Sequence, residues 1–108
     1  MLFIDSSHVA KVGSDVAHLF LRVLPRPAHG VLVHVHDICY PFSYPLDWLK
    51  QGRAFNESLL LRAFLIGNSQ FEVVAFNSYA KRELSYLFAE RLPEIKQGGS
   101  SIWLRKVS

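Results

Sequence analysis

The stretch that decides the fold is residues 31–37, VLVHVHD. Apolar residues fill most of its first five positions, and the stretch then ends in the titratable pair His36 and Asp37. A short apolar run that stops in this way is typical of a buried strand in a parallel sheet. Ligands of open α/β sheets bind at the carboxyl ends of the strands, so a polar pair there indicates a site.

A second apolar run, residues 1–4, ends in a similar way, in Asp5, Ser6, Ser7 and His8. Between the two runs, Ser14 is expected to cap a helix that has Asp15 in its first turn. The apolar residues of this helix follow at helical spacing: Val16, Leu19, Phe20 and Val23. Strand, helix and strand over this length predict a βαβ unit with two parallel neighbouring strands. Asp5 and Asp37 should therefore lie close together at one edge of the sheet.

The rest of the chain continues the alternation of helices and strands. Residues 38–53 are expected to form a long loop rich in aromatic side chains, and loops of this length in a compact domain are usually functional. The further expected elements are a helix over residues 55–66 that ends at Gly67, a strand over 71–76, a helix over 82–92 and a strand over 101–106. The pattern predicts one α/β domain with four strands.

Composition excludes several classes of protein. The chain has 108 residues, a net charge of +3 and basic residues that are scattered along it, so nucleic-acid binding is not expected. A single cysteine, Cys39, forms neither an internal disulfide nor a cysteine metal cluster. No apolar stretch reaches the length of about 18 residues typical of a membrane helix, and no signal-peptide pattern is visible. We expect a cytoplasmic protein with no membrane partner.

Four residues at the two strand ends are the first candidates for chemistry: Asp5, His8, His36 and Asp37. Carboxylates and imidazoles that converge at one sheet edge either bind a divalent metal or supply a general base near neutral pH. The structural alternative is that Asp5 caps a loop and His36 is a hydrogen-bonded edge residue. His34 shares a strand face with His36 but lies deeper, so we expect a hydrogen-bonded core histidine there.

Two further groups have a functional and a structural interpretation. The aromatic residues of the long loop either line an apolar substrate pocket or pack over the sheet edge: Tyr40, Phe42, Tyr44 and Trp48. Asn56 and Glu57 either contact the substrate or serve the N-terminus of the second helix. No G-x-G-x-x-G turn, P-loop or G-x-S-x-G elbow is present, so no cofactor-binding residues can be identified.

The segments LFIDSSHVAKVGSDVAHLFLRVLP and GVLVHVHDI resemble the class I S-adenosylmethionine-dependent methyltransferases. They are most similar to the bacterial branch of cephalosporin-hydroxylase-like and macrocin O-methyltransferase-like proteins. The resemblance continues through RAFNESLLLRAFL and FEVVAFNSY to SSIWLRK, so it covers nearly the whole chain.

This resemblance implies that residues 1–108 are a single partial domain, the C-terminal half of a Rossmann-like sheet. The four strands would be the family's fourth to seventh, in the order 4-5-7-6, with strand seven antiparallel. It implies S-adenosylmethionine as cofactor and methyl transfer to a small-molecule or sugar-like acceptor. Metal-dependent relatives hold magnesium on acids at the ends of strands four and five. By position those acids are Asp5 and Asp37, and His36 stands where relatives often have another acid.

The two strand ends and the resemblance together predict a catalytic set of His8, His36 and Asp37, and a set of Asp5, His36 and Asp37 for magnesium or another divalent metal. Tyr40, Asn56 and Glu57 are the candidates for contacting substrate. The glycine-rich turn that holds the cofactor in the family has no counterpart here, so we expect this polypeptide alone to be inactive. The partner is expected to be the missing N-terminal half or a second copy. The alternative is a catalytically inactive half-domain that acts as a structural or self-associating module.

Overall fold

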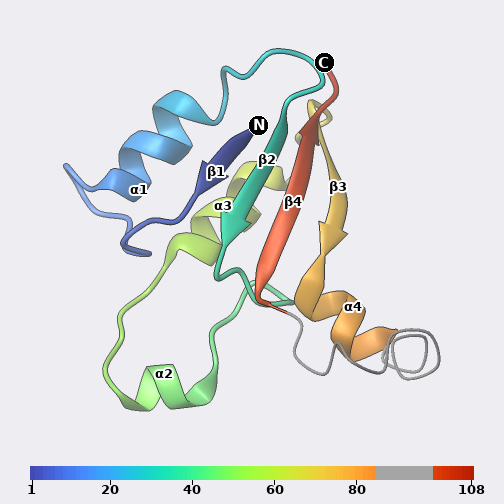
Figure 1. Cartoon of the computed structure of the whole chain (residues 1–108). Coiled ribbons are helices and arrows are strands. Elements are labelled where there is room, and N and C mark those ends of the chain that lie inside the picture. Colours follow the sequence, from blue (N-terminus) through green and yellow to red (C-terminus); the bar gives the residue numbers. More distant parts are fainter. Residues whose placement is uncertain (85–98) are drawn as a thin grey trace.

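The protein has an α/β fold built on one sheet of four strands (Figure 1). The computed structural model describes residues 1–84 and 99–108. The elements in chain order are β1 (Leu2–Ile4), α1 (Asp15–His18), the π-helix η1 (Leu19–Val23), β2 (Leu32–His36), α2 (Leu46–Lys50), α3 (Glu57–Leu65), β3 (Phe71–Phe76), α4 (Asn77–Glu83) and β4 (Ser101–Lys106).

The strands lie in the order β1-β2-β4-β3. β1 is parallel to β2, whereas β4 is antiparallel to both of its neighbours, β2 and β3. This confirms the predicted parallel pairing of the first two strands. It is also the order and direction that the resemblance implies, with the last strand of the chain inserted between the two before it.

The helix after β1 begins at the predicted cap. The Ser14 side chain accepts a hydrogen bond from the Ala17 backbone N–H at 3.1 Å, and Asp15 lies in the first turn. The predicted single helix is in fact α1 followed by the π-helix η1, with Phe20 and Leu24 fully buried. The apolar stripe thus packs against the sheet in spite of the change in helical pitch.

The hydrophobic core lies on one face of the sheet. Strand residues in register, such as Ile4 beside Val35 and Val35 beside Ile102, point to this face. Phe20 of η1 and Leu61 of α3 join the same buried cluster. α1, η1 and α3 therefore cover this face, and the opposite face carries Phe3, His34 and Trp103, which are register partners across β1, β2 and β4.

His34 is buried, as predicted, but it is not hydrogen-bonded. Its residue is 8% exposed, and neither ring nitrogen has a hydrogen-bond partner among residues 1–84 and 99–108. The ring instead stacks on Phe3, with centroids 4.4 Å apart, and meets the edge of Trp103 at 4.5 Å. The prediction of a hydrogen-bonded histidine was wrong because both cross-strand neighbours are aromatic and offer the imidazole no polar partner.

This unpartnered histidine predicts a loss of stability in acid. Burial, together with the charge of His36, lowers the pKa of His34 below its ordinary value of 6.5, with the charge of Asp5 opposing. The unfolded chain therefore binds a proton at His34 more readily than the folded chain does. The contribution of the neutral His34 to the free energy of unfolding is complete above about pH 6.5 and declines as the pH falls below it. We expect His34→Phe, which keeps the stacking, to flatten the decline in unfolding free energy between about pH 7 and pH 5.

Urea unfolding at several pH values measures this effect. His29→Phe, at an exposed turn residue, is the matched control and should retain the wild-type pH dependence. An identical decline in the His34→Phe variant would show that another group is responsible.

Three elements differ from the sequence prediction. The expected loop over residues 38–53 contains the short helix α2, which lies on an arm, residues 38–55, that stands away from the sheet (Figure 1). α3 begins at Glu57, two residues later than predicted. α4 begins directly after β3 rather than at Arg82, and residues 85–92 of the predicted helix lie outside the described residues. None of the helices in the described ranges has the length and hydropathy needed to cross a bilayer.

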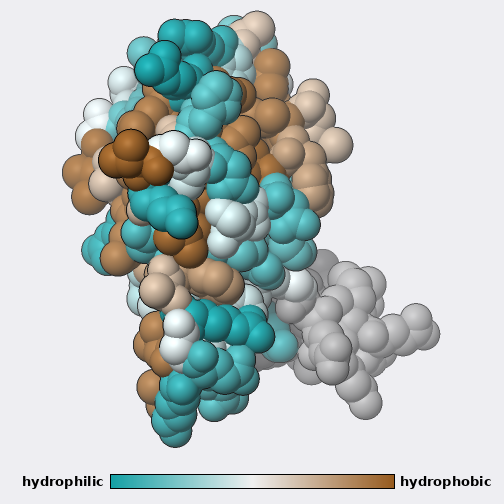
Figure 2. Space-filling view, turned by 90° about the vertical axis from the view of Figure 1, so that its left-hand side faces the viewer, coloured by the Kyte–Doolittle hydropathy of each residue, from teal (hydrophilic) through white to brown (hydrophobic). Residues whose placement is uncertain are grey.

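The edge strand β1 predicts self-association. Phe3 is 57% exposed and Met1 81% exposed, and β1 has a neighbour on one side only within the described sheet. Figure 2 views the molecule from the side of β1 and α1 and shows several hydrophobic patches at this surface. Unpaired strand edges and exposed apolar area favour association, because buried apolar area contributes about 25 cal/mol per Å². We expect a dimer or larger species in sedimentation, and Phe3→Lys should shift it toward the monomer.

Leu59→Lys is the control, because Leu59 is similarly exposed but lies on α3, away from β1. This variant should leave the sedimentation unchanged. A wild-type chain that sediments as a 12.3 kDa monomer at every concentration would contradict the prediction.

Candidate functional site

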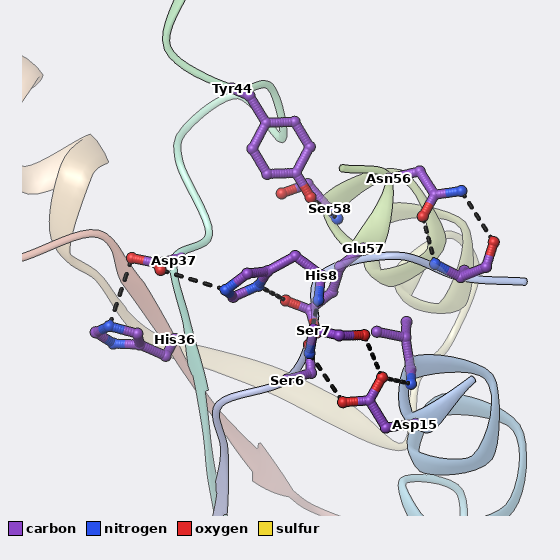
Figure 3. A network of polar contacts seen from close by, with 12 residues as sticks. Ser6, Ser7, His8, Asp15, His36, Asp37, Tyr44, Asn56, Glu57 and Ser58 are labelled. Carbon is purple, nitrogen blue, oxygen red and sulfur yellow. Dashed lines mark hydrogen bonds and ion pairs between the residues drawn. The ribbon is translucent and has the colours of Figure 1, made fainter. Parts of the chain in front are cut away.

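The candidate site lies at the carboxyl ends of β1 and β2, next to the N-terminus of α3 (Figure 3). The His8 ring stands between two carboxylates there. Its Nδ1 lies 3.0 Å from Glu57 Oε1, and its Nε2 lies 3.4 Å from Asp37 Oδ2. His36 Nε2 lies 3.4 Å from the other Asp37 oxygen, Oδ1. Three segments far apart in the chain therefore converge on one imidazole.

Local backbone structure brings His8 into this position. His8 and Asp37 have φ values of 65° and 58°, in the left-handed region that residues other than glycine seldom adopt. The His8 carbonyl accepts hydrogen bonds from the backbone N–H groups of Asn56 at 3.0 Å and Glu57 at 3.2 Å. Such backbone conformations persist only where the surroundings impose them, and they concentrate at functional sites.

The Asn56 side chain hydrogen-bonds the segment after β1 to the start of α3. Its Oδ1 accepts a hydrogen bond from the Ala10 backbone N–H at 2.5 Å, and its Nδ2 donates to the Ala10 carbonyl at 3.1 Å. Together with the bonds to the His8 carbonyl, this pairing ties the segment after β1 to the start of α3. Asn56 therefore orients His8 through the backbone.

Glu57 holds one side of the His8 ring. Its side chain is fully buried and accepts hydrogen bonds from the Ser6 hydroxyl and from His8 Nδ1. A buried carboxylate is costly unless it is paired, and here each of its oxygens has a partner. In the neutral tautomer that donates from Nδ1 to Glu57, the lone pair of the ring is at Nε2, the nitrogen that faces Asp37.

The Nε2 side of His8 is less buried than the Nδ1 side. The Asp37 side chain that faces Nε2 is 28% exposed, in contrast to the fully buried Glu57. The contact of 3.4 Å between Nε2 and Asp37 is also longer than the 3.0 Å contact on the Glu57 side. The two nitrogens of the ring therefore have different surroundings.

The four aromatic residues of the predicted loop cluster separate into two groups. Tyr40 and Phe42 pack against Phe76 of β3, with centroids 5.7 Å and 5.3 Å away, so they cover the sheet edge. Tyr44 and Trp48 instead pack against a ring that the sequence did not indicate, Phe55, each with centroids 5.7 Å apart. The interpretation as packing over the sheet edge therefore holds for Tyr40 and Phe42, and a substrate pocket at Tyr44 and Trp48 stays a prediction.

Phe55 links the second group to the site, because its ring lies 5.0 Å from the His8 ring. Tyr44 reaches the start of α3, where its hydroxyl accepts a hydrogen bond from the Ser58 backbone N–H at 2.9 Å (Figure 3). Burial raises the pKa of the Tyr44 hydroxyl above its ordinary value. The one sequence signal for Phe55 was its place just before Asn56 and Glu57.

The structure brings some of the predicted site residues into contact and leaves others apart. His8, His36 and Asp37 lie together, and Glu57 joins them through His8. Asp5 lies at the same end of the sheet, one residue beyond Ile4 of β1, and its side chain is exposed. Within the described ranges, no three His, Cys, Asp or Glu side chains are grouped so as to hold a metal ion. A metal held by Asp5, His36 and Asp37 stays a prediction from the sequence.

Comparison of the chain with family models, with curated proteins and with solved structures found no match.

Proposed function

We propose that the chain supplies the acceptor side of a methyltransferase of the class I S-adenosylmethionine-dependent type, with His8 as the general base. The observation that carries the proposal is the His8 ring, held at Nδ1 by the buried Glu57 and facing the partly exposed Asp37 at Nε2. An imidazole oriented by a carboxylate in this way is a recurring arrangement for taking a proton from a hydroxyl. The strand order β1-β2-β4-β3, with β4 antiparallel, supports the same assignment.

The reaction of this chain's residues is a proton transfer. An acceptor hydroxyl donates a hydrogen bond to His8 Nε2, its O–H bond breaks, and the proton passes to Nε2 while the oxygen keeps the electron pair. The oxygen thereby becomes a stronger nucleophile toward a methyl group. The imidazolium that forms lies between the Asp37 and Glu57 carboxylates, which stabilise its positive charge.

S-adenosylmethionine would supply the methyl group, but the described residues do not form a pocket for it. β1 is followed by Asp5 and two serines rather than by a glycine-rich turn, and both serine hydroxyls are bonded to carboxylates of the chain itself. A divalent metal is not part of this proposal either, because no three His, Cys, Asp or Glu side chains of the described residues are grouped so as to hold one. The role of this chain is therefore confined to the acceptor.

A second candidate function is a self-associating module without catalysis. The exposed Phe3 on the edge strand β1 favours it. The two candidates differ in whether His8 is needed, because association through β1 does not involve the side chain of His8.

The test is transfer of tritium from methyl-labelled S-adenosylmethionine by the product of the complete gene. Small hydroxylated ring compounds serve as acceptors, and the label is counted in the extracted product. We expect transfer that requires an acceptor hydroxyl, with no transfer to the O-methylated form of the same compound. A folded protein that transfers no label to any hydroxylated acceptor would contradict the proposal.

A further inference from the structure

The β1 edge of the sheet indicates how this chain binds a partner. We infer that a second copy of the chain adds to this edge as an antiparallel strand, about a two-fold axis at Leu2, so that Met1 of each copy covers Phe3 of the other. This arrangement is independent of methyl transfer. Three features support it: a row of rings that is open at one end, the contrast between the two edges of the sheet, and the exposed area of the chain.

A row of rings crosses the sheet on the face opposite α1 and α3, and it ends at β1. Trp103, His34 and Phe3 are register partners on β4, β2 and β1, and their ring centroids lie 4.5 Å and 4.4 Å apart. On the side of β3 the row stops at Ala75, the register partner of Trp103. Phe3, the last ring, is 57% exposed. Side chains on neighbouring strands stabilise one another, so an apolar residue on an added strand would continue the row.

The two edges of the sheet differ in the features that prevent edge pairing. At β3, the register shifts between Val73 and Ala75, and the edge strand carries the charge of Glu72, 2.8 Å from Arg105. Bulges and charged side chains are common means of blocking a sheet edge. β1 has the sequence LFI, without a charge, and pairs in unbroken register with β2. Among the described strands, β1 therefore offers the one suitable edge, which limits assembly to a closed dimer.

Burial along β1 determines the register of the added strand. Ile4 is 1% exposed, so the chain itself already covers this end of the edge, whereas Met1 and Phe3 are exposed. An antiparallel pair centred on Leu2 uses residues 1–3 alone and places Phe3 opposite Met1 of the second copy. Met1 and Phe3 point to the same face because side chains alternate along a strand. A methionine thioether packs favourably against an aromatic ring, so the facing side chains are complementary.

The antiparallel arrangement keeps charges and candidate sites apart. The carboxyl ends of the two β1 strands point in opposite directions, so each His8 lies at its own end of the joined sheet of eight strands. The two copies of Asp5 lie on opposite sides of the axis, about 20 Å apart along the strands. Salt screens most of the repulsion at this distance. Dimerisation therefore brings no like charges together and leaves the candidate site outside the interface.

The exposed area of the chain also favours assembly. Its accessible surface is 7021 Å², whereas a compact monomer of 12.3 kDa exposes about 6,100 Å². The difference of about 900 Å² is close to the roughly 800 Å² that each partner contributes to a standard interface. Phe3 of β1 and Leu21 of η1, which is 67% exposed, contribute to this difference. Figure 2 shows hydrophobic patches on this side of the molecule.

A disulfide test locates the axis. Leu2→Cys in a Cys39→Ser background places two thiols opposite each other, where facing Cβ atoms are about 4.5–5.5 Å apart, close to disulfide geometry. We expect diamide to convert most of the chain into a covalent dimer of about 25 kDa, twice 12.3 kDa, on a non-reducing gel. Ile66→Cys in the same background is the control, because Ile66 is 73% exposed and follows α3. It should give little crosslinking.

A charge exchange at Leu2 is the second test. A residue on a two-fold axis faces its own copy, so Leu2→Lys and Leu2→Glu should each dimerise about tenfold more weakly in sedimentation. A mixture of the two should regain the wild-type dimer, which chains that had merely lost their fold could not do. No rescue in the mixture, crosslinking at position 66 but not at position 2, or species larger than a dimer would each overturn the inference. A monomeric wild type would leave the edge to a different partner and would overturn it too.

Discussion

Replacing His8 by glutamine is expected to lower the rate of label transfer about 10²- to 10⁴-fold, the usual contribution of a general base. Glutamine can still donate a hydrogen bond to Glu57, but it has no group that accepts a proton at the position of Nε2. The rate loss should appear mainly in kcat, because the acceptor also contacts other residues of the site. Initial rates of tritium transfer over a range of acceptor concentrations measure the two parameters separately.

His18→Gln is the matched control for this variant. His18 lies on α1 with an exposed side chain and takes no part in the contacts of the site. We expect its kinetics to equal those of the wild type. If His8→Gln transferred label at the wild-type rate, His8 would not be the base. Circular dichroism of both variants checks that the fold is retained.

Removing the Glu57 side chain is expected to destabilise the fold by about 1–3 kcal/mol for each of the two buried donors that lose their acceptor. In Glu57→Ala the Ser6 hydroxyl and His8 Nδ1 both lose their acceptor, and a cavity opens at the start of α3. Domains of this size are stable by only about 5–15 kcal/mol, so much of the stability is lost. Urea unfolding of the wild type and the variant gives the difference.

Glu57→Gln separates the hydrogen bonds from the charge. The amide keeps an acceptor for His8 Nδ1 and presents an N–H₂ group to the Ser6 hydroxyl, so we expect a smaller loss of stability than for alanine. Its effect on label transfer should still be clear, because the neutral amide stabilises the imidazolium less than a carboxylate does. A Glu57→Ala variant as stable as the wild type would mean that Glu57 does not hold His8 in solution.

The strands could be predicted from the sequence because their signals are local, and short apolar runs that end in polar residues mark β1 and β2. The order of all four strands was implied only by the resemblance. Parallel pairing predicted that the residues after β1 and β2 lie at the same edge, but the contact between His8 and Asp37 also depends on the hydrogen bonds that join the segment after β1 to α3.

The partnership between His8 and Glu57 could not be predicted in the same way. The two residues are 49 positions apart, and they meet because the segment after β1 is hydrogen-bonded to the start of α3. From the sequence alone, a glutamate in the first turn of a helix is explained by its favourable interaction with the helix dipole. Nothing in the local pattern distinguishes such a glutamate from one whose side chain is turned inward onto a histidine.

The helix α2 was missed for a related reason. Its five residues are too few for a periodic pattern, and the flanking breakers Pro45 and Gly52 favour a loop. The same brevity explains why Phe55 was not recognised. Of its partners, Tyr44 precedes α2 and Trp48 lies within it, and a helix of five residues is too short for a spacing to be counted.

Both carboxylates that flank His8 are the anchors of a single arm. Residues 38–55 depart immediately after Asp37 and return immediately before Asn56 and Glu57. His8 and the two carboxylates thus lie on the body of the fold, while Tyr44, Trp48 and Phe55 lie on an insertion between two fixed points. Under the proposed function, a change in the length or composition of this insertion would alter the surroundings of the acceptor and leave the proposed base in place.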